Sequence, residues 1–310
     1  MKKPILQSKN AFVAYVFGTY EKYIPFYIYF INKNYPNHDV LIFNQWYVSS
    51  NVKESINSLK NFYIYENIYP ELNEIKGSGG SKALRWLLPR KFFINYKYVY
   101  IGDVDVLILK ENQLLFDFHK NQMDKFNLPF SNKVRLLPDG QTSKRLTCLH
   151  FFEVDPYYDK VETLSNNLLN DKKSAYDFLS RFKRDEHALY HIVKKSIGFN
   201  EYEVAKMKRP WHGFHIGVVR GGKKLTEKQL NENSSISYDQ IKFQLFNILK
   251  EKEFINLFNS SFCVELYWSF KQFDLQLPLS VHLSYFKFKF DRIKKRVINK
   301  LKNKIKFWLK

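Results

Sequence analysis

The sequence predicts an α/β protein with a largely parallel sheet. Over the first hundred residues, short apolar segments rich in β-branched and aromatic side chains alternate with segments of helical periodicity. This alternation is typical of strand–helix–strand units. Apolar residues make up 45% of the 310 positions, which is enough for one large core. Glycine and proline are sparse, so long disordered tracts are not expected.

The individual elements follow from local patterns. Apolar runs predict the strands, and apolar residues three and four positions apart predict the helices. A cluster of glycine and serine predicts a loop at 77–81, and Pro25 suits the first turn of a helix. The expected strands are 11–17, 39–43, 62–65, 98–102, 146–154 and 215–219, and the expected helices are 21–34, 51–60, 82–95, 185–196, 238–258 and 290–310.

Two cysteines exclude a disulfide framework and a cysteine-rich zinc site. They favour a reducing compartment. Residues 1–9 lack the apolar core of a signal peptide, and no run of 18 apolar residues predicts a transmembrane helix. We therefore expect a cytoplasmic protein.

Two aspartates follow the fourth expected strand. The apolar run from residue 98 breaks at Gly102, presents Asp103 and Asp105, and becomes apolar again. Ligands of open α/β sheets bind at the carboxyl ends of strands, and two hard oxygen ligands can share Mg²⁺ or Mn²⁺. Such a cation could hold a diphosphate. A turn or a helix cap would use the same residues, but two uncompensated carboxylates between apolar runs would be costly, which favours a cation.

The C-terminal segment is strongly basic. The whole chain carries 50 basic and 30 acidic residues, and residues 287–310 hold nine Lys and two Arg against one Asp. Half of the net charge of +20 therefore lies in the last 24 residues. Ile293, Val297, Leu301, Ile305 and Trp308 fall at helical spacing opposite the basic residues. An apolar stripe with a tryptophan favours an anionic membrane surface over nucleic acid, so we expect a membrane-associating tail at 286–310, on the inner face of the cell membrane, and no nucleic-acid partner.

Three segments resemble one enzyme family. Residues 82–89 (KALRWLLP), 98–108 (YVYIGDVDVLI) and 15–19 (YVFGT) look like the donor site of GT-A glycosyltransferases, in particular the galactosyltransferase-like group (glycosyltransferase family 8-like) that includes bacterial lipo-oligosaccharide enzymes. The resemblance covers about residues 10–220. It implies a Rossmann-like, nucleotide-binding mixed sheet over residues 1–285. It also implies that a sugar is transferred, with retention of anomeric configuration, from a nucleotide-diphosphate sugar, expected to be a UDP-sugar, to a glycan or glycolipid acceptor in capsule or lipo-oligosaccharide biosynthesis.

The resemblance also implies roles for individual residues. Mn²⁺ or Mg²⁺ and the donor diphosphate would be bound at the paired aspartates, and an acidic helix start would face the acceptor and the reacting sugar. Either acidic residue there would equally serve as an ordinary first-turn carboxylate. The implied residues are Phe17, Gly18 and Thr19 near the nucleoside, Lys82 and Arg85 near the phosphates, Asp103, Val104 and Asp105 at the donor diphosphate, with the metal on the two aspartates, and Asp185 and Glu186 at the helix start.

A late histidine completes the metal site in that family, within a His-x-x-Gly-x-x-Lys-Pro-Trp pattern that this sequence does not reproduce. Residues 209–220 read RPWHGFHIGVVR instead. We expect His215 to be the third ligand and His212 to be the second choice, because neutral imidazole suits Mn²⁺ beside carboxylates. Arg220 could hold a phosphate by a bidentate contact.

Two other functions compete with this interpretation. A phosphatase of the haloacid-dehalogenase type also places Asp-x-Asp after a strand, but it needs a later Gly-Asp-x-x-x-Asp site. The only Gly-Asp in this chain is Gly102-Asp103 itself. A basic, non-enzymatic protein that binds nucleic acid or membranes would explain the charge but would leave the aspartates without a role.

Overall fold

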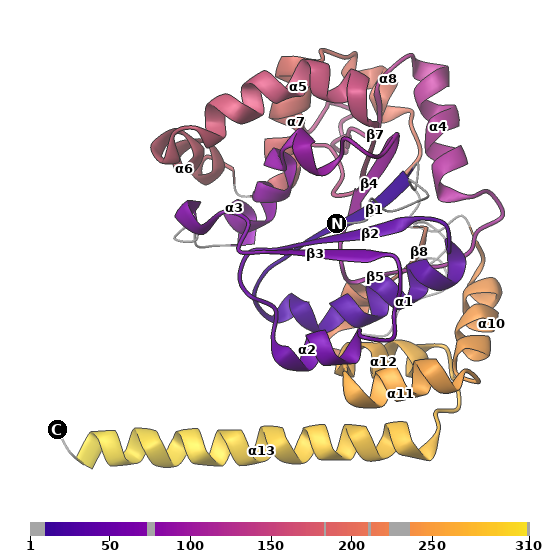
Figure 1. Cartoon of the computed structure of the whole chain (residues 1–310), viewed down its shortest axis with the longest axis vertical. Coiled ribbons are helices and arrows are strands. Elements are labelled where there is room, and N and C mark those ends of the chain that lie inside the picture. Colours follow the sequence, from indigo (N-terminus) through magenta and orange to yellow (C-terminus); the bar gives the residue numbers. More distant parts are fainter. Residues whose placement is uncertain (1–9, 73–77, 183, 210–211, 223–235, 309–310) are drawn as a thin grey trace, which may run out of the picture.

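A computed structural model describes residues 10–72, 78–182, 184–209, 212–222 and 236–308. Its central feature is a mixed, six-stranded sheet, so the predicted α/β class is confirmed (Figure 1). Four neighbouring strands pair in parallel, and the two pairings at one edge are antiparallel, because one strand there runs in the opposite direction. The strands, in spatial order, are β3 (Phe62–Glu66), β2 (Asp39–Asn44), β1 (Asn10–Val16), β4 (Tyr98–Gly102), β7 (His150–Glu153) and β6 (Phe130–Ser131).

Alternation along β1 explains how the sheet buries both of its faces. Phe12 and Ala14 belong to one apolar cluster, whereas Val13 and Tyr15 belong to a second. Successive side chains of a strand point to opposite faces, so helices must cover the sheet on both sides (Figure 1). Residues of α1 (Ile24–Asn34), α4 (Leu115–Phe126), α10 (Tyr238–Ile248), α11 (Lys252–Ser260) and α12 (Val264–Gln272) join the first cluster, and residues of α3 (Ser78–Ala83), α5 (Val154–Leu169), α6 (Lys172–Ser180), α7 (Asp185–Ser196) and α8 (Glu201–Ala205) join or adjoin the second.

Two further elements extend this body. A two-stranded antiparallel sheet pairs β5 (Val106–Ile108) with β8 (Gly213–His215). The last helix, α13 (Leu279–Trp308), packs its beginning near α11 and then projects past the rest of the molecule (Figure 1). The short helix α2 (Ser50–Ser55) lies between β2 and β3 in the chain. No helix in the described part of the chain is long and apolar enough to cross a membrane.

The segment that precedes β4 differs from the prediction. We expected a loop at 77–81 and one helix over 82–95, but α3 begins at Ser78 and changes to a 3-10 helix over Leu84–Leu87. Leu88 is extended, and a second 3-10 turn covers Arg90–Phe92. The cause is Pro89, which lacks an N–H donor and disfavours helical backbone at the residue before it.

Several other predicted element boundaries differ from those in the structure. The predicted helix 185–196 is confirmed as α7, whereas the predicted helix 238–258 is interrupted after α10 and resumes as α11. The predicted strand 146–154 shortens to β7, and the predicted helix 51–60 shortens to α2. The predicted strand 215–219 was wrong in position, because β8 ends at His215 and a 3-10 helix (Ile216–Gly222) follows it.

Candidate functional site

Two carboxylates and one imidazole meet where β4 ends. Ligand atoms of Asp103, Asp105 and His215 all lie within 4.8 Å of one another, and in the described part of the chain they are the one such group of three or more. His215 Nε2 is 3.2 Å from Asp105 Oδ1. Two hard oxygens and a borderline nitrogen form a donor set that fits Mn²⁺ or Mg²⁺. The residues that are present therefore fit a divalent cation.

The small sheet brings the histidine to the aspartates. β5 follows Asp105 directly, and its antiparallel pairing with β8 sets Val106 opposite His215. The Ile216 N–H also donates to the Asp105 carbonyl over 2.8 Å. Because this pairing joins segments about 110 residues apart, the third ligand depends on tertiary structure and not on a local motif.

Gly217 lies against the ligands. A Cβ atom at this position would stand 2.7 Å from Asp105 Oδ2 and 2.8 Å from His215 Nε2. Real Cβ atoms essentially never come closer than 3.0 Å to such neighbours, so any larger residue would displace one ligand or both. Gly217 belongs to the site for this steric reason.

Arg85 connects the metal ligands to α7. Its guanidinium donates to Asp103 Oδ1 over 2.7 Å through Nη1, and to Asp185 through Nη2. Burial alone would raise the pKa of Asp103, but the positive charge of the Arg85 guanidinium, followed by electrostatic interaction with His215, outweighs it and holds that pKa below its usual range. Burial opposes the charge on Arg85 too, yet Asp185 and Asp103 raise its pKa. Asp103 is therefore ionised and ready to bind a cation.

A cavity of about 100 Å³ opens onto these residues. It combines cations, carboxylates and aromatic rings, and the rings of Phe17 and Tyr20 lie 5.3 Å apart on one side of it. Seven of its nine lining residues were expected from the sequence. They are Phe17, Lys82, Arg85, Asp103, Val104, Asp105 and His215, joined by Tyr15 and Tyr20.

The expected turn lies after β1. Gly18 has a φ of +55° and Thr19 is exposed. Only glycine adopts a left-handed backbone at little cost, and the turn lets the chain pass from β1 into the 3-10 helix Gly18–Tyr23. The turn therefore adjoins the cavity through Phe17.

Two tyrosines were not expected at the site. Tyr15 lines the cavity, and its hydroxyl is buried without a hydrogen-bond partner in the described structure. Its position near the end of an apolar strand was the signal that could have identified it. Tyr20 lies one residue past the expected turn, and it was missed because a lone aromatic residue carries no specific signal.

The acidic start of α7 splits into two environments. Asp185 reaches the donor cavity through Arg85. Glu186 instead accepts from Arg135 Nη2 over 2.8 Å and lies 3.2 Å from Arg145 Nε. The expected pair therefore contacts two different groups of arginines.

His212 lies apart from the group formed by Asp103, Asp105 and His215. His212 is buried, and its Nε2 is 2.9 Å from His119 Nε2. Its Nδ1 is 3.8 Å from a carboxylate oxygen of Glu111. Arg220 belongs to the 3-10 helix after β8, and its side chain lies outside the described structure. Trp211 of the same motif also falls outside the described residues.

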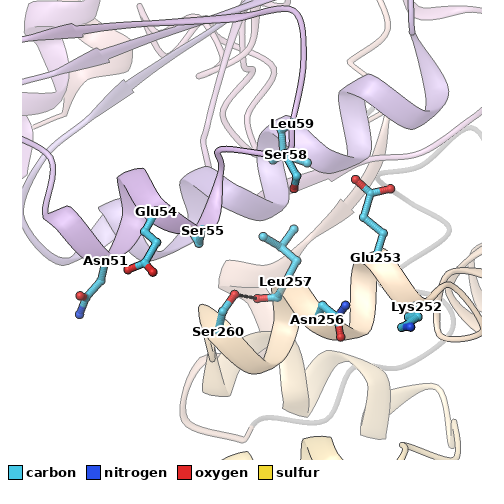
Figure 2. Close-up of a pocket in the computed structure, with 10 residues that line it drawn as sticks. All are labelled: Asn51, Glu54, Ser55, Ser58, Leu59, Lys252, Glu253, Asn256, Leu257 and Ser260. Atoms are coloured by element: carbon cyan, nitrogen blue, oxygen red, sulfur yellow. Dashed lines mark hydrogen bonds between the residues drawn. The ribbon is translucent and has the colours of Figure 1, made fainter.

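A larger cavity lies elsewhere. It measures about 890 Å³, lies between α2 and α11, and shares no lining residue with the cavity at the carboxylates (Figure 2). Its walls are mainly Asn, Ser and Glu side chains over Leu59 and Leu257. We take the smaller cavity as the candidate site, because of these two cavities it is the one lined by the group of possible metal ligands.

Comparison with known proteins gives structural likeness only. No protein-family model and no curated protein sequence matches the chain. One similar solved structure is the galactosyltransferase LgtC in complex with donor and acceptor sugar analogues, with a TM-score of 0.40 and 10% identity over 58% of this chain and 69% of that one. Another is core-mannan synthase A from Aspergillus fumigatus in its Mn/GDP form, with a TM-score of 0.40 and 11% identity over 60% and 69%.

A third similar structure is the glycosyltransferase GlyE of Streptococcus pneumoniae, with a TM-score of 0.38 and 14% identity. The match covers 61% of this chain and 44% of that one.

Proposed function

We propose that this chain is a metal-dependent glycosyltransferase. It would move a sugar from a nucleotide-diphosphate sugar to a cell-surface glycan or glycolipid acceptor. The observation that carries the proposal is the meeting of Asp103, Asp105 and His215 at the carboxyl end of a parallel strand, facing a cavity with two cationic side chains. Ligands of open α/β sheets bind at such strand ends.

Different residues of the cavity would bind the metal and the phosphates of the donor. Asp103, Asp105 and His215 would hold Mn²⁺ or Mg²⁺, whose chemistry is to neutralise the departing diphosphate. Lys82 and Arg85, which line the same cavity, would contact the phosphates. Val104 lines the cavity between the two aspartates, and Arg220 is a further proposed phosphate contact.

The nucleoside would extend beyond the cavity. A volume of about 100 Å³ accommodates a cation and phosphate oxygens, whereas pockets for drug-sized ligands measure roughly 300 to 1,000 Å³. Phe17 and Tyr20 offer ring faces for a base, and the turn at Gly18 and Thr19 adjoins them. We propose uridine as the base on the family resemblance.

The acceptor side is assigned to the start of α7. Asp185 is held by Arg85, so its carboxylate stays next to the donor site. It and Glu186 would face the reacting sugar, where carboxylates stabilise an oxocarbenium-like transition state. We propose retention of anomeric configuration, as in the family that the sequence resembles.

The test is metal-dependent release of nucleoside diphosphate. Purified protein is incubated with a panel of nucleotide sugars, with Mn²⁺ or with a chelator. Asp103→Asn and Asp105→Asn should each lower the release at least 100-fold, because metal stabilisation of charge contributes about 3 kcal/mol or more. Asp159→Asn is the matched control, since Asp159 of α5 is exposed and pairs with Arg90 of the 3-10 turn Arg90–Phe92. Equal activity of the three variants would reject the site.

We further propose that α13 attaches the enzyme to the inner face of the cell membrane through residues 286–310. Its described side chains expose an apolar series at three- and four-residue spacing, with Lys and Arg between. The exposed series is Leu279, Leu283, Phe286, Phe290, Ile293, Val297 and Leu301.

Vesicle sedimentation tests the attachment. The full chain should bind vesicles that contain anionic lipid, bind neutral vesicles less, and dissociate as salt screens the charge. Deletion of 287–310 should abolish binding while leaving nucleoside diphosphate release unchanged in a lipid-free assay. Undiminished binding of the truncated protein would rule out the tail as the membrane-binding element.

A further inference from the structure

Four arginines converge on one side of the proposed donor site. Arg135 and Arg145 come from the segment between β6 and β7, Arg184 precedes α7, and Arg209 precedes β8. Glu186 contacts the first two, and the charges of Arg135, Arg184 and Arg209 all act on Arg145. The group is assembled by the fold, because its members are spread over 75 residues of sequence.

The charges in this arginine group do not balance. Glu186 is the carboxylate that contacts Arg135 and Arg145. Arg184 is exposed and forms no ion pair within the described structure, and Arg209 Nη2 donates to the sulfur of Cys148 over 3.0 Å. Burial, followed by repulsion from the other three arginines, lowers the pKa of Arg145 even though Glu186 opposes the shift. Arg135, Arg145 and Arg184 therefore bring three positive charges to one contacting carboxylate, which is a surplus of positive charge without counting Arg209.

Two chains of contacts connect the arginine group with the proposed metal ligands. Glu186 is next to Asp185, which binds Arg85, and Arg85 binds Asp103. On the other path, Arg209 donates to Cys148, and the Cys148 side chain hydrogen-bonds to Asp103. The surplus charge thus adjoins the place where the sugar would be transferred, rather than lying on a remote surface.

We propose that Arg135, Arg145 and Arg184 bind an anionic group, a phosphate or a carboxylate, on the acceptor. This inference rests on the proposed glycosyltransferase function and narrows its acceptor to acidic glycans or glycolipids. Guanidinium groups bind both anions by paired N–H donors. The amino-terminal end of the 12-residue helix α7 adds partial positive charge at the same place. A group that only anchored Glu186 would not need the exposed Arg184.

Three hexose probes test the inference. Galactose, galacturonate and galactose 6-phosphate share a ring and differ in charge, and each is titrated by calorimetry or NMR into full-length protein, both alone and with Mn²⁺ and UDP added. At least one anionic probe should bind ten times more tightly than galactose. The tighter of the two identifies a carboxylate or a phosphate as the recognised group.

Variants tie the preference to the arginine group. Arg184→Gln should remove most of the tenfold preference. Arg184→Lys should keep part of the preference, because lysine retains the positive charge but lacks the paired N–H donors of the guanidinium group. Arg181→Gln is the matched control, since Arg181 is exposed and its charge acts on His191. Equal or absent binding of all three probes, or an undiminished preference in Arg184→Gln, would overturn the inference.

A separate readout distinguishes this inference from the proposed function. Binding of UDP with Mn²⁺ and release of nucleoside diphosphate are measured on the same protein samples. If these fail while anionic probes still bind through Arg184, the glycosyltransferase proposal is wrong and the anion site stands. If they succeed and no anionic preference appears, only the acceptor class is wrong.

Discussion

Replacement of Gly217 by alanine tests the geometry of the metal site without changing any ligand. The added Cβ would stand 2.7 Å from Asp105 Oδ2 and 2.8 Å from His215 Nε2, which falls 0.7 and 0.6 Å short of the 3.4 Å where ordinary contact begins. Asp105 is almost fully buried, so it has little room to retreat. The ligand atoms must therefore move by several tenths of an ångström.

Such a displacement is large for metal coordination, because Mg²⁺ requires its oxygen ligands at about 2.0–2.1 Å in near-ideal geometry. Disturbing groups that orient ligands typically costs about 10- to 100-fold in metal affinity. Overpacking itself costs about 1–3 kcal/mol of folding free energy. We therefore expect Gly217→Ala to remain folded and to bind Mn²⁺ at least tenfold more weakly.

The assay is a Mn²⁺ titration followed by electron paramagnetic resonance, with thermal unfolding measured in parallel. Gly198→Ala is the matched control. Gly198 has a φ of +70° and open space around its Cβ position, so alanine should cost about 1–2 kcal/mol through backbone strain alone. It should destabilise the protein and leave Mn²⁺ affinity unchanged. Wild-type affinity in Gly217→Ala would refute the placement of the metal between Asp105 and His215.

Two further predictions concern buried charges. Arg85→Met should destabilise the protein by about 3–5 kcal/mol, because Asp103 and Asp185 lose their shared counter-charge. Adding Mn²⁺ should recover part of the lost melting temperature, because the cation compensates the charge of Asp103. Wild-type stability of the variant in metal-free buffer would contradict this prediction. Burial raises the pKa of Glu111 to about 8 from a usual 4.5, so the folded state keeps a proton that the unfolded chain releases. Glu111 should then leave the free energy of unfolding unchanged below pH 4.5. Between pH 4.5 and pH 8 it should lower the free energy of unfolding by roughly 1.4 kcal/mol per pH unit at most. Glu111→Gln should therefore raise the melting temperature at pH 8 and not at pH 4, and an equal shift at both would be inconsistent with the raised pKa.

The sequence was informative where local physics decides. Apolar runs predicted β1, β2 and β3, and helical spacing predicted α7 with its observed bounds. Asp103 and Asp105 were correctly placed after a buried strand because one short segment contains both the strand and the break at Gly102. Local prediction failed around Pro89, where one proline divided an expected helix into short turns.

The tertiary structure decided how distant residues combine. The sequence offered two histidines three residues apart, and the pairing of β5 with β8 placed His215 beside Asp105 and left His212 against His119. Arg85 and Asp185 are 100 residues apart in sequence, and the arginine group around Glu186 has no sequence signature. These contacts depend on strand register and helix packing, which a one-dimensional pattern does not contain. The sequence by itself determined the α/β class and the paired carboxylates, whereas the fold selected the third ligand, the buried counter-charge and the neighbouring surplus of positive charge.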